Sequence, residues 1–123
     1  MTRFTLLGAG LMMLVVGALH LLNPQMMMRE PGIVLSSTNH FHVVRAAYGG
    51  AYLGIAALFL AGAWRRIDVQ AALAAVVLLF GGFALGRIVS IAVDGMPVPL
   101  YLGVLSAELF FVVCAVLALR RPA

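Results

Sequence analysis

The sequence predicts an all-α integral membrane protein, a four-helix bundle that forms a single domain over residues 1–123. Three observations predict this fold. The chain is 64% hydrophobic and only 10% charged, its mean hydropathy is +1.12, and long apolar runs recur along it. Soluble domains are closer to half apolar and a quarter charged, so a chain this short would expose much apolar surface to water. A lipid bilayer removes that cost.

Each apolar run is long enough to cross a bilayer, because a spanning helix needs about 20 mostly apolar residues. The predicted spans are residues 4–22, 41–63, 69–93 and 100–119. The first exceeds the length of a signal-peptide core, so we expect it to be retained. Residues 36–39 are Ser-Ser-Thr-Asn, good N-cap residues for the second helix. The links at 64–68 and 94–99 are short, and the second contains Gly and two Pro, which end helices.

The basic residues predict the orientation. All eight are Arg. Four spans place both termini on one side, which carries five of them, whereas the other side has Arg29 beside Glu30. The positive-inside rule therefore predicts cytoplasmic termini and a multi-pass protein of the cell inner (cytoplasmic) membrane. Scattered single and paired Arg residues do not form the basic patch that nucleic-acid binding needs. The five Arg residues on the side of the termini are Arg3, Arg65, Arg66, Arg120 and Arg121.

Two small-x-x-x-small patterns predict helix packing. Gly50 and Gly54 lie on the second helix, and Gly82 and Gly86 lie on the third. Small residues let helix backbones approach closely, which drives association within lipid. We expect these helices to be neighbours in one bundle, as their short link also suggests. The oligomeric state stays open.

The polar residues of the spans are predicted to gather in the outer leaflet. At 1.5 Å per residue, Arg87 lies about 10 Å and Glu108 about 12 Å from the outer ends of their helices. Ionisable groups at such depths face inward, pair or serve function. Two stripes at i, i+3 and i+7 support convergence on Glu108. They are Arg45, Tyr48 and Tyr52 on the second helix, and Arg87, Ser90 and Asp94 on the third.

Further polar residues are predicted at the rim of this cluster: His20, Asn23, Asn39, His42 and Tyr101. His20, His40 and His42 could together form a metal or haem site, since His is the commonest metal ligand. Side chains at i and i+2 do not converge, however, and we expect no cofactor. The single Cys114 cannot form an intramolecular disulfide or a C-x-x-C pair.

Catalytic motifs such as G-x-S-x-G and H-E-x-x-H do not occur, and a non-catalytic protein is favoured. Three functions stay open. The outer cluster of Arg45, Arg87 and Glu108 could bind a small amphiphile, a lipid head group or a partner helix. Glu108 could serve a small proton- or ion-coupled transporter. The histidines could serve a membrane redox or haem subunit. A purely structural Arg–Glu pair is the alternative to all three.

Several strings resemble a known family. They are Thr38-Asn39-x-Phe41-x-x-x-Arg45-Ala46-x-Tyr48-Gly49-Gly50, then Gly82-Phe83-Ala84-x-Gly86-Arg87-x-x-Ser90, Asp94-Gly95-x-Pro97, and Glu108 in the last helix. From about Asn23 onward the chain resembles the bacterial domain-of-unknown-function family numbered 4345. The resemblance implies four helices in about 120 residues. It implies no established activity, substrate or cofactor.

Overall fold

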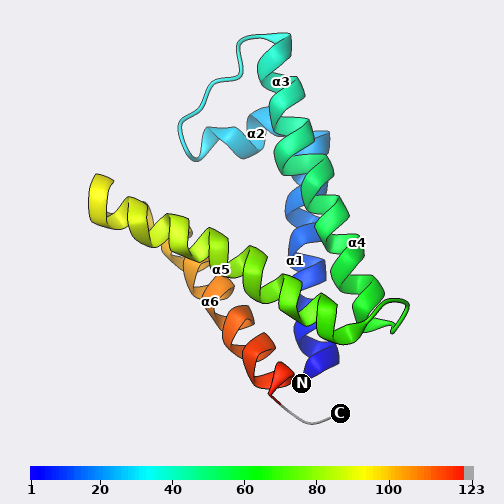
Figure 1. Cartoon of the computed structure of the whole chain (residues 1–123). Helices are drawn as coiled ribbons and strands as arrows, with labels where there is room; N and C mark the ends of the chain where they lie inside the picture. The colour runs from blue at the N-terminus through cyan, green and yellow to red at the C-terminus, as the bar shows by residue number, and fades with distance from the viewer. Residues whose placement is uncertain (121–123) are drawn as a thin grey trace.

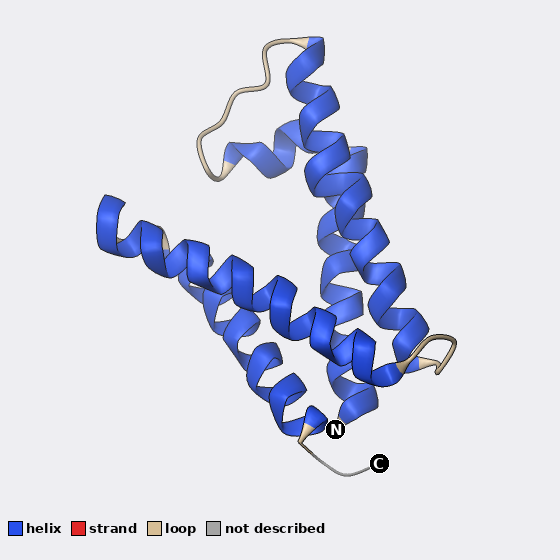
Figure 2. Ribbon diagram, viewed as in Figure 1, coloured by secondary structure: helices blue, strands red, loops and turns tan. Residues whose placement is uncertain are grey.

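The computed structural model describes residues 1–120. Arg121, which the orientation argument counted, lies outside the described residues. Within residues 1–120 the regular structure is entirely helical (Figure 2). The elements in order are α1 (Thr2–Leu22), α2 (Pro24–Arg29), α3 (Thr38–Val44), the π-helical segment η1 (Arg45–Gly50), α4 (Ala51–Ala63), α5 (Val69–Asp94) and α6 (Pro99–Leu119).

Four of the helical stretches are long and apolar enough to cross a membrane: Thr2–Leu22, Thr38–Ala63, Val69–Asp94 and Pro99–Leu119. They confirm the four predicted helices. The second begins three residues before the predicted 41, because Ser37 caps α3 by accepting a hydrogen bond of 3.3 Å from the His40 N–H. Capping by a serine side chain satisfies a backbone donor that the helix leaves free. The predicted cap region therefore sets this boundary.

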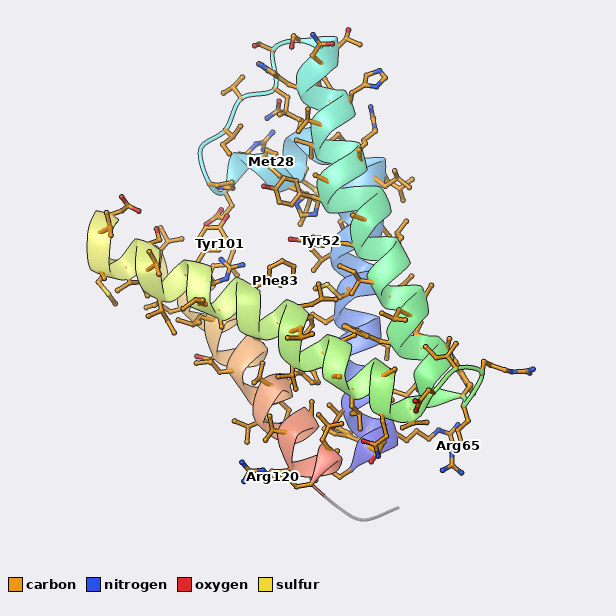
Figure 3. All side chains as sticks on the ribbon, viewed as in Figure 1. Met28, Tyr52, Arg65, Phe83, Tyr101 and Arg120 are labelled. Carbon is orange, nitrogen blue, oxygen red and sulfur yellow. The ribbon has the colours of Figure 1, made fainter. Side chains whose placement is uncertain are left out.

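The helices form two pairs. In the first pair α1 packs along α4 and η1, and in the second α5 packs along α6. The pairs meet at the end of the molecule where α1 begins and α6 finishes, and separate toward the other end (Figure 1). We call the first the basic end, since it carries Arg3, Arg65, Arg66 and Arg120, and the second the open end. Arg65 and Arg120 mark the basic end in Figure 3.

The core that joins the two pairs lies toward the basic end. The buried residues of α5 run from Ala72 to Ala84, in the part of the helix nearer that end. Phe59 of α4 and Phe80 of α5 are both fully buried, and their rings meet edge to face with centroids 5.8 Å apart. Burial of two Phe side chains is among the larger apolar contributions a core can contain. The four long helices thus pack together as a bundle only in the half of the molecule nearer the basic end.

The glycines that allow close packing are not the predicted ones. A Cβ added to Gly54, Gly82 or Gly86 would meet nothing within 4 Å, so the predicted packing of the second and third helices through these positions is wrong. Close approach occurs instead where α1 meets α4 and η1. A Cβ on Gly17 would lie 3.0 Å from the Leu53 nitrogen, and one on Gly49 would lie 3.1 Å from the Leu21 Cα.

The π-helical segment η1 interrupts the second candidate span. At its end the Ala51 N–H bonds to the carbonyl of Ala46, five residues earlier. A π turn inserts a residue into an α-helix, so side chains before it are rotated by about 100° relative to those after it. The stripe predicted from regular α-helical spacing therefore cannot stay straight across this segment. This changes the surroundings of Arg45.

Candidate functional site

An ion pair joins the second helix pair. The Nε–H of Arg87 on α5 is shared between the two carboxylate oxygens of Glu108 on α6, at 3.1 and 3.0 Å. Glu108 is only 2% exposed, whereas the Arg87 side chain is 35% exposed. A carboxylate this deep in an apolar helix needs such a partner, because burying an unpaired charge is costly. The structure thus brings together two of the three central residues predicted.

The Arg87 guanidinium lies beside a small cavity. The carbon Cζ is 5.7 Å from the centre of the Tyr101 ring, a cation–π distance. Arg87, Ser90 and Tyr101 line a cavity of about 210 Å³ together with apolar atoms of α5, α6 and the link between them. Within residues 1–120, Arg87 makes its side-chain hydrogen bonds through Nε alone. Its two terminal amino groups therefore keep their hydrogen-bond donors unused within these residues.

Arg45 lies elsewhere. Its Nε–H donates to the carbonyl of Leu21 at 3.0 Å, and its Cζ is 5.6 Å from the Phe41 ring centre. It is exposed and contacts the last turn of α1. The predicted cluster of Arg45, Arg87 and Glu108 is accordingly divided, because Arg45 bonds to α1 whereas Arg87 pairs with Glu108. Arg45 instead satisfies a carbonyl that the end of α1 leaves free.

The tyrosines of the second span form an aromatic group with α1 and α5. His20 stacks on Tyr48 at 5.6 Å between ring centroids, and Tyr52 lies 6.3 Å from His20. Tyr52 also meets Phe83 of α5 at 5.8 Å, so this group connects the two helix pairs. Figure 3 shows Tyr52, Phe83 and Tyr101 between the pairs. The His20 Nδ1 lies 2.8 Å from the carbonyl of Val16, which fixes the ring.

The remaining predicted residues make local contacts. Ser90 donates a hydrogen bond of 2.8 Å to Asp94, so that stripe of α5 holds its predicted spacing. Asn23 caps α2 by accepting from the Met26 N–H at 3.3 Å. His40 accepts from the Ser36 N–H at 3.1 Å. Asn39 and His42 are exposed on α3.

The predicted histidines are held in separate contacts. Among residues 1–120, no group of three or more His, Cys, Asp and Glu side chains is arranged to hold a metal ion. His20 is 8% exposed within the aromatic group, whereas His40 lies in the exposed cap of α3. In this structure these histidines are therefore not arranged to bind one metal ion together.

The sequence motifs that resemble a known family contain the residues of three structural features. These are the ion pair of Arg87 and Glu108, the hydrogen bond between Ser90 and Asp94, and the start of α3. The sequence pattern of the family described as domain of unknown function (DUF4345) matches residues 1–119. The chain belongs to the DUF4345 family. No curated protein and no solved structure matches the chain.

In this DUF4345 protein, sequence reasoning missed part of the cavity wall. Ile91, Pro97 and Leu105 line the cavity beside Arg87, and none of them was singled out as a site residue. Ile91 and Leu105 are apolar residues in apolar helices, so their composition carries no signal. Spacing could have found Ile91, which follows Arg87 by four residues and so shares its face of α5.

Proposed function

We propose that this protein is a non-catalytic, multi-pass protein of the inner membrane that binds the polar head group of a small amphiphile at Arg87. The observation that carries the proposal is a guanidinium held by Glu108 through Nε, with its terminal amino groups beside a cavity. Arg presents donors in a planar fork, so fixing one edge orients the others. An oriented fork suits a carboxylate, a phosphate or another oxygen acceptor.

The size of the cavity supports a head group as the bound part. Ligand pockets commonly enclose about 300–1,000 Å³, and this cavity of about 210 Å³ is smaller. Ser90 and Tyr101 add hydroxyl groups to its wall, whereas Ile91 and Leu105 add apolar surface. We infer that an oxygen-rich head group occupies the cavity while the apolar chain of the same molecule remains in the surrounding lipid.

The contacts of Glu108 favour this function over proton-coupled transport. Arg87 donates to both carboxylate oxygens, so Glu108 orients the Arg87 guanidinium. The buried core toward the basic end is largely apolar, and its fully buried side chains include Phe59, Val76 and Phe80. These apolar residues offer a proton or an ion no polar partners, and the hydroxyl of Thr5, which is also buried, already donates to the Met1 carbonyl at 3.0 Å.

Mass spectrometry of the detergent-purified protein tests the proposal. We expect the wild type to retain a small amphiphile at a fixed stoichiometry, and Arg87→Lys to lose it. A lysine ammonium can still pair with Glu108, but it lacks the planar fork that serves both the carboxylate and the cavity. Leu105→Trp, which fills the cavity and leaves the ion pair in place, should lose the same molecule.

Arg45→Lys is the matched control, because it makes the same chemical change at an arginine outside the cavity. It should retain the amphiphile at the wild-type level. Loss of the molecule from Arg45→Lys and Arg87→Lys alike would instead favour the wider cluster that the sequence suggested. A wild-type protein that carries no amphiphile would refute the proposed function.

A further inference from the structure

A second, larger cavity lies at the basic end, and it shares no residue with the cavity at Arg87. Its volume is about 750 Å³. The start of α1, the end of α4, the turn that follows α4 and the start of α5 form its walls, with Ala118 of α6. Because these are the ends of all four candidate spans, the cavity lies where a spanning chain meets the boundary between lipid and water.

The wall of this cavity combines positive charge with apolar surface. Arg3 and Arg65 line it, and within residues 1–120 neither side chain has a hydrogen-bond or ion-pair partner. Asp68 also lines it, but one of its oxygens accepts a hydrogen bond of 2.8 Å from the Gln70 N–H. Trp64 and Val69 contribute accessible apolar atoms. The two free guanidinium groups thus give the cavity a net positive charge.

The backbone at Arg65 ends α4 beside the cavity. Its φ is +57°, the left-handed conformation that normally selects glycine after a helix. The Arg65 N–H closes the end of α4 by donating to the Gly62 carbonyl at 3.0 Å. This helix-ending turn places Arg65 among the residues that line the cavity. The preceding Trp64 also lines the cavity and is 55% exposed, as is typical of side chains at the lipid–water boundary.

We propose that the basic-end cavity binds the phosphate of an anionic phospholipid through Arg3 and Arg65. The guanidinium groups match a phosphate in charge and hydrogen bonding. The apolar wall and Trp64 match the glycerol and upper acyl region of the same lipid. A soluble phosphate compound would share the first match but not the second. This site is separate from the amphiphile site at Arg87.

Native mass spectrometry in detergent, with phosphatidylglycerol and phosphatidylcholine added in equal amounts, tests the proposal. Detergent removes the bilayer surface potential, so a preference reports on a defined site. The wild type should retain phosphatidylglycerol in preference. Arg3→Gln and Arg65→Gly should each lower that preference roughly tenfold, the factor expected for the loss of one hydrogen bond between charged groups. Glycine suits the backbone at position 65, so this variant keeps the fold.

Arg66→Gly is the matched control: it removes an equal charge from the neighbouring residue, which does not line the cavity. Its preference should equal that of the wild type. Equal retention of the two lipids by the wild type, or an equal loss in Arg66→Gly and Arg65→Gly, would overturn the proposal. A lipid held at Arg87 would be counted in both of these variants alike, so their difference reports on the basic end alone.

Adding millimolar glycerol 3-phosphate separates the two sources of a phosphate. We expect bound phosphatidylglycerol to stay in place, because the soluble compound lacks the acyl region that contacts the apolar wall. Displacement of the lipid would show that the cavity takes a soluble phosphate compound, and would overturn its assignment to a phospholipid.

Discussion

Arg87 and Glu108 differ in how much each depends on the other. Glu108 is 2% exposed, whereas the Arg87 side chain is 35% exposed. A long, flexible arginine can turn its charged group toward a more polar region, which a short glutamate cannot do. Loss of Arg87 therefore leaves a buried carboxylate, whereas loss of Glu108 leaves a partly exposed guanidinium. Removing Arg87 and removing Glu108 should therefore change the free energy of unfolding by different amounts.

This asymmetry predicts the order of two substitutions. Arg87→Leu strands a buried carboxylate and should lower the free energy of unfolding by about 3–5 kcal/mol. Glu108→Leu leaves a partly exposed guanidinium and should cost less, about 1–2 kcal/mol. The double variant should lie close to the wild type, since apolar replacement of a whole buried pair is often neutral.

Denaturant titration of the purified protein, followed by the fluorescence of its single Trp64, measures all four members of this double-mutant cycle. Equal losses from the two single variants would contradict the asymmetry. A double variant as unstable as Arg87→Leu would show that the ion pair stabilises the fold by more than two apolar side chains in its place do.

At the scale of single residues, sequence reasoning found the ion pair and missed its isolation from Arg45. Glu108 was identifiable because it is an ionisable residue within an apolar run. Arg87 was identifiable because its predicted depth in the membrane matched that of Glu108. Arg45 met the same criteria, but it begins the π-helical segment and bonds to the Leu21 carbonyl of α1. The Gly49-Gly50 pair, which weakens an α-helix, is the local signal that could have indicated that turn.

At the scale of elements, the contact between α1 and the second span depends on glycines in both. A Cβ on Gly17 would lie 3.0 Å from the Tyr52 Cβ as well as from the Leu53 nitrogen, and backbone atoms cannot move aside cheaply. Gly54 has open space around it. The first glycine serves packing, whereas the second leaves its face of α4 uncovered.

These surroundings predict opposite effects of one substitution. Gly17→Ala should lower the melting temperature, because it forces the helices apart. Gly54→Ala should raise the stability by roughly 0.5–1 kcal/mol, since alanine favours the helix. Thermal unfolding in one detergent compares the two variants directly. A strongly destabilised Gly54→Ala would indicate that this face contacts a second protein chain in the purified sample.

Sequence patterns predicted the helices better than their partners. Each span was long and apolar, and the boundaries at Ser37 and at Pro99 follow from capping and from proline at a helix start. Pairing was not predictable in the same way. Lipid and protein interior are both apolar, so a hydrophobic run does not record which face meets a helix and which meets lipid. Gly82 and Gly86 carry a packing motif without a packing partner.

At the scale of the whole molecule, the basic end gathers the start of α1 and the end of α6 (Figure 1). If the helices span the inner membrane with this end in the cytoplasm, a reporter fused after Ala123 should act only there. We expect a C-terminal fluorescent protein to be bright and a C-terminal alkaline phosphatase to be inactive. The reverse pattern would overturn the orientation, and would place the basic-end cavity in the opposite leaflet.

The cavity at Arg87 has walls from α5, α6 and their link, and none from α1 or α4. A site inside a closed bundle would exchange its ligand with water, whereas this one would border the hydrocarbon phase on its uncovered side if the helices span a membrane as proposed. Occupancy would then follow the mole fraction of ligand in the bilayer instead of its aqueous concentration. Diluting the membrane with inert lipid at a constant total amount of ligand should therefore empty the site, although the concentration in the sample is unchanged.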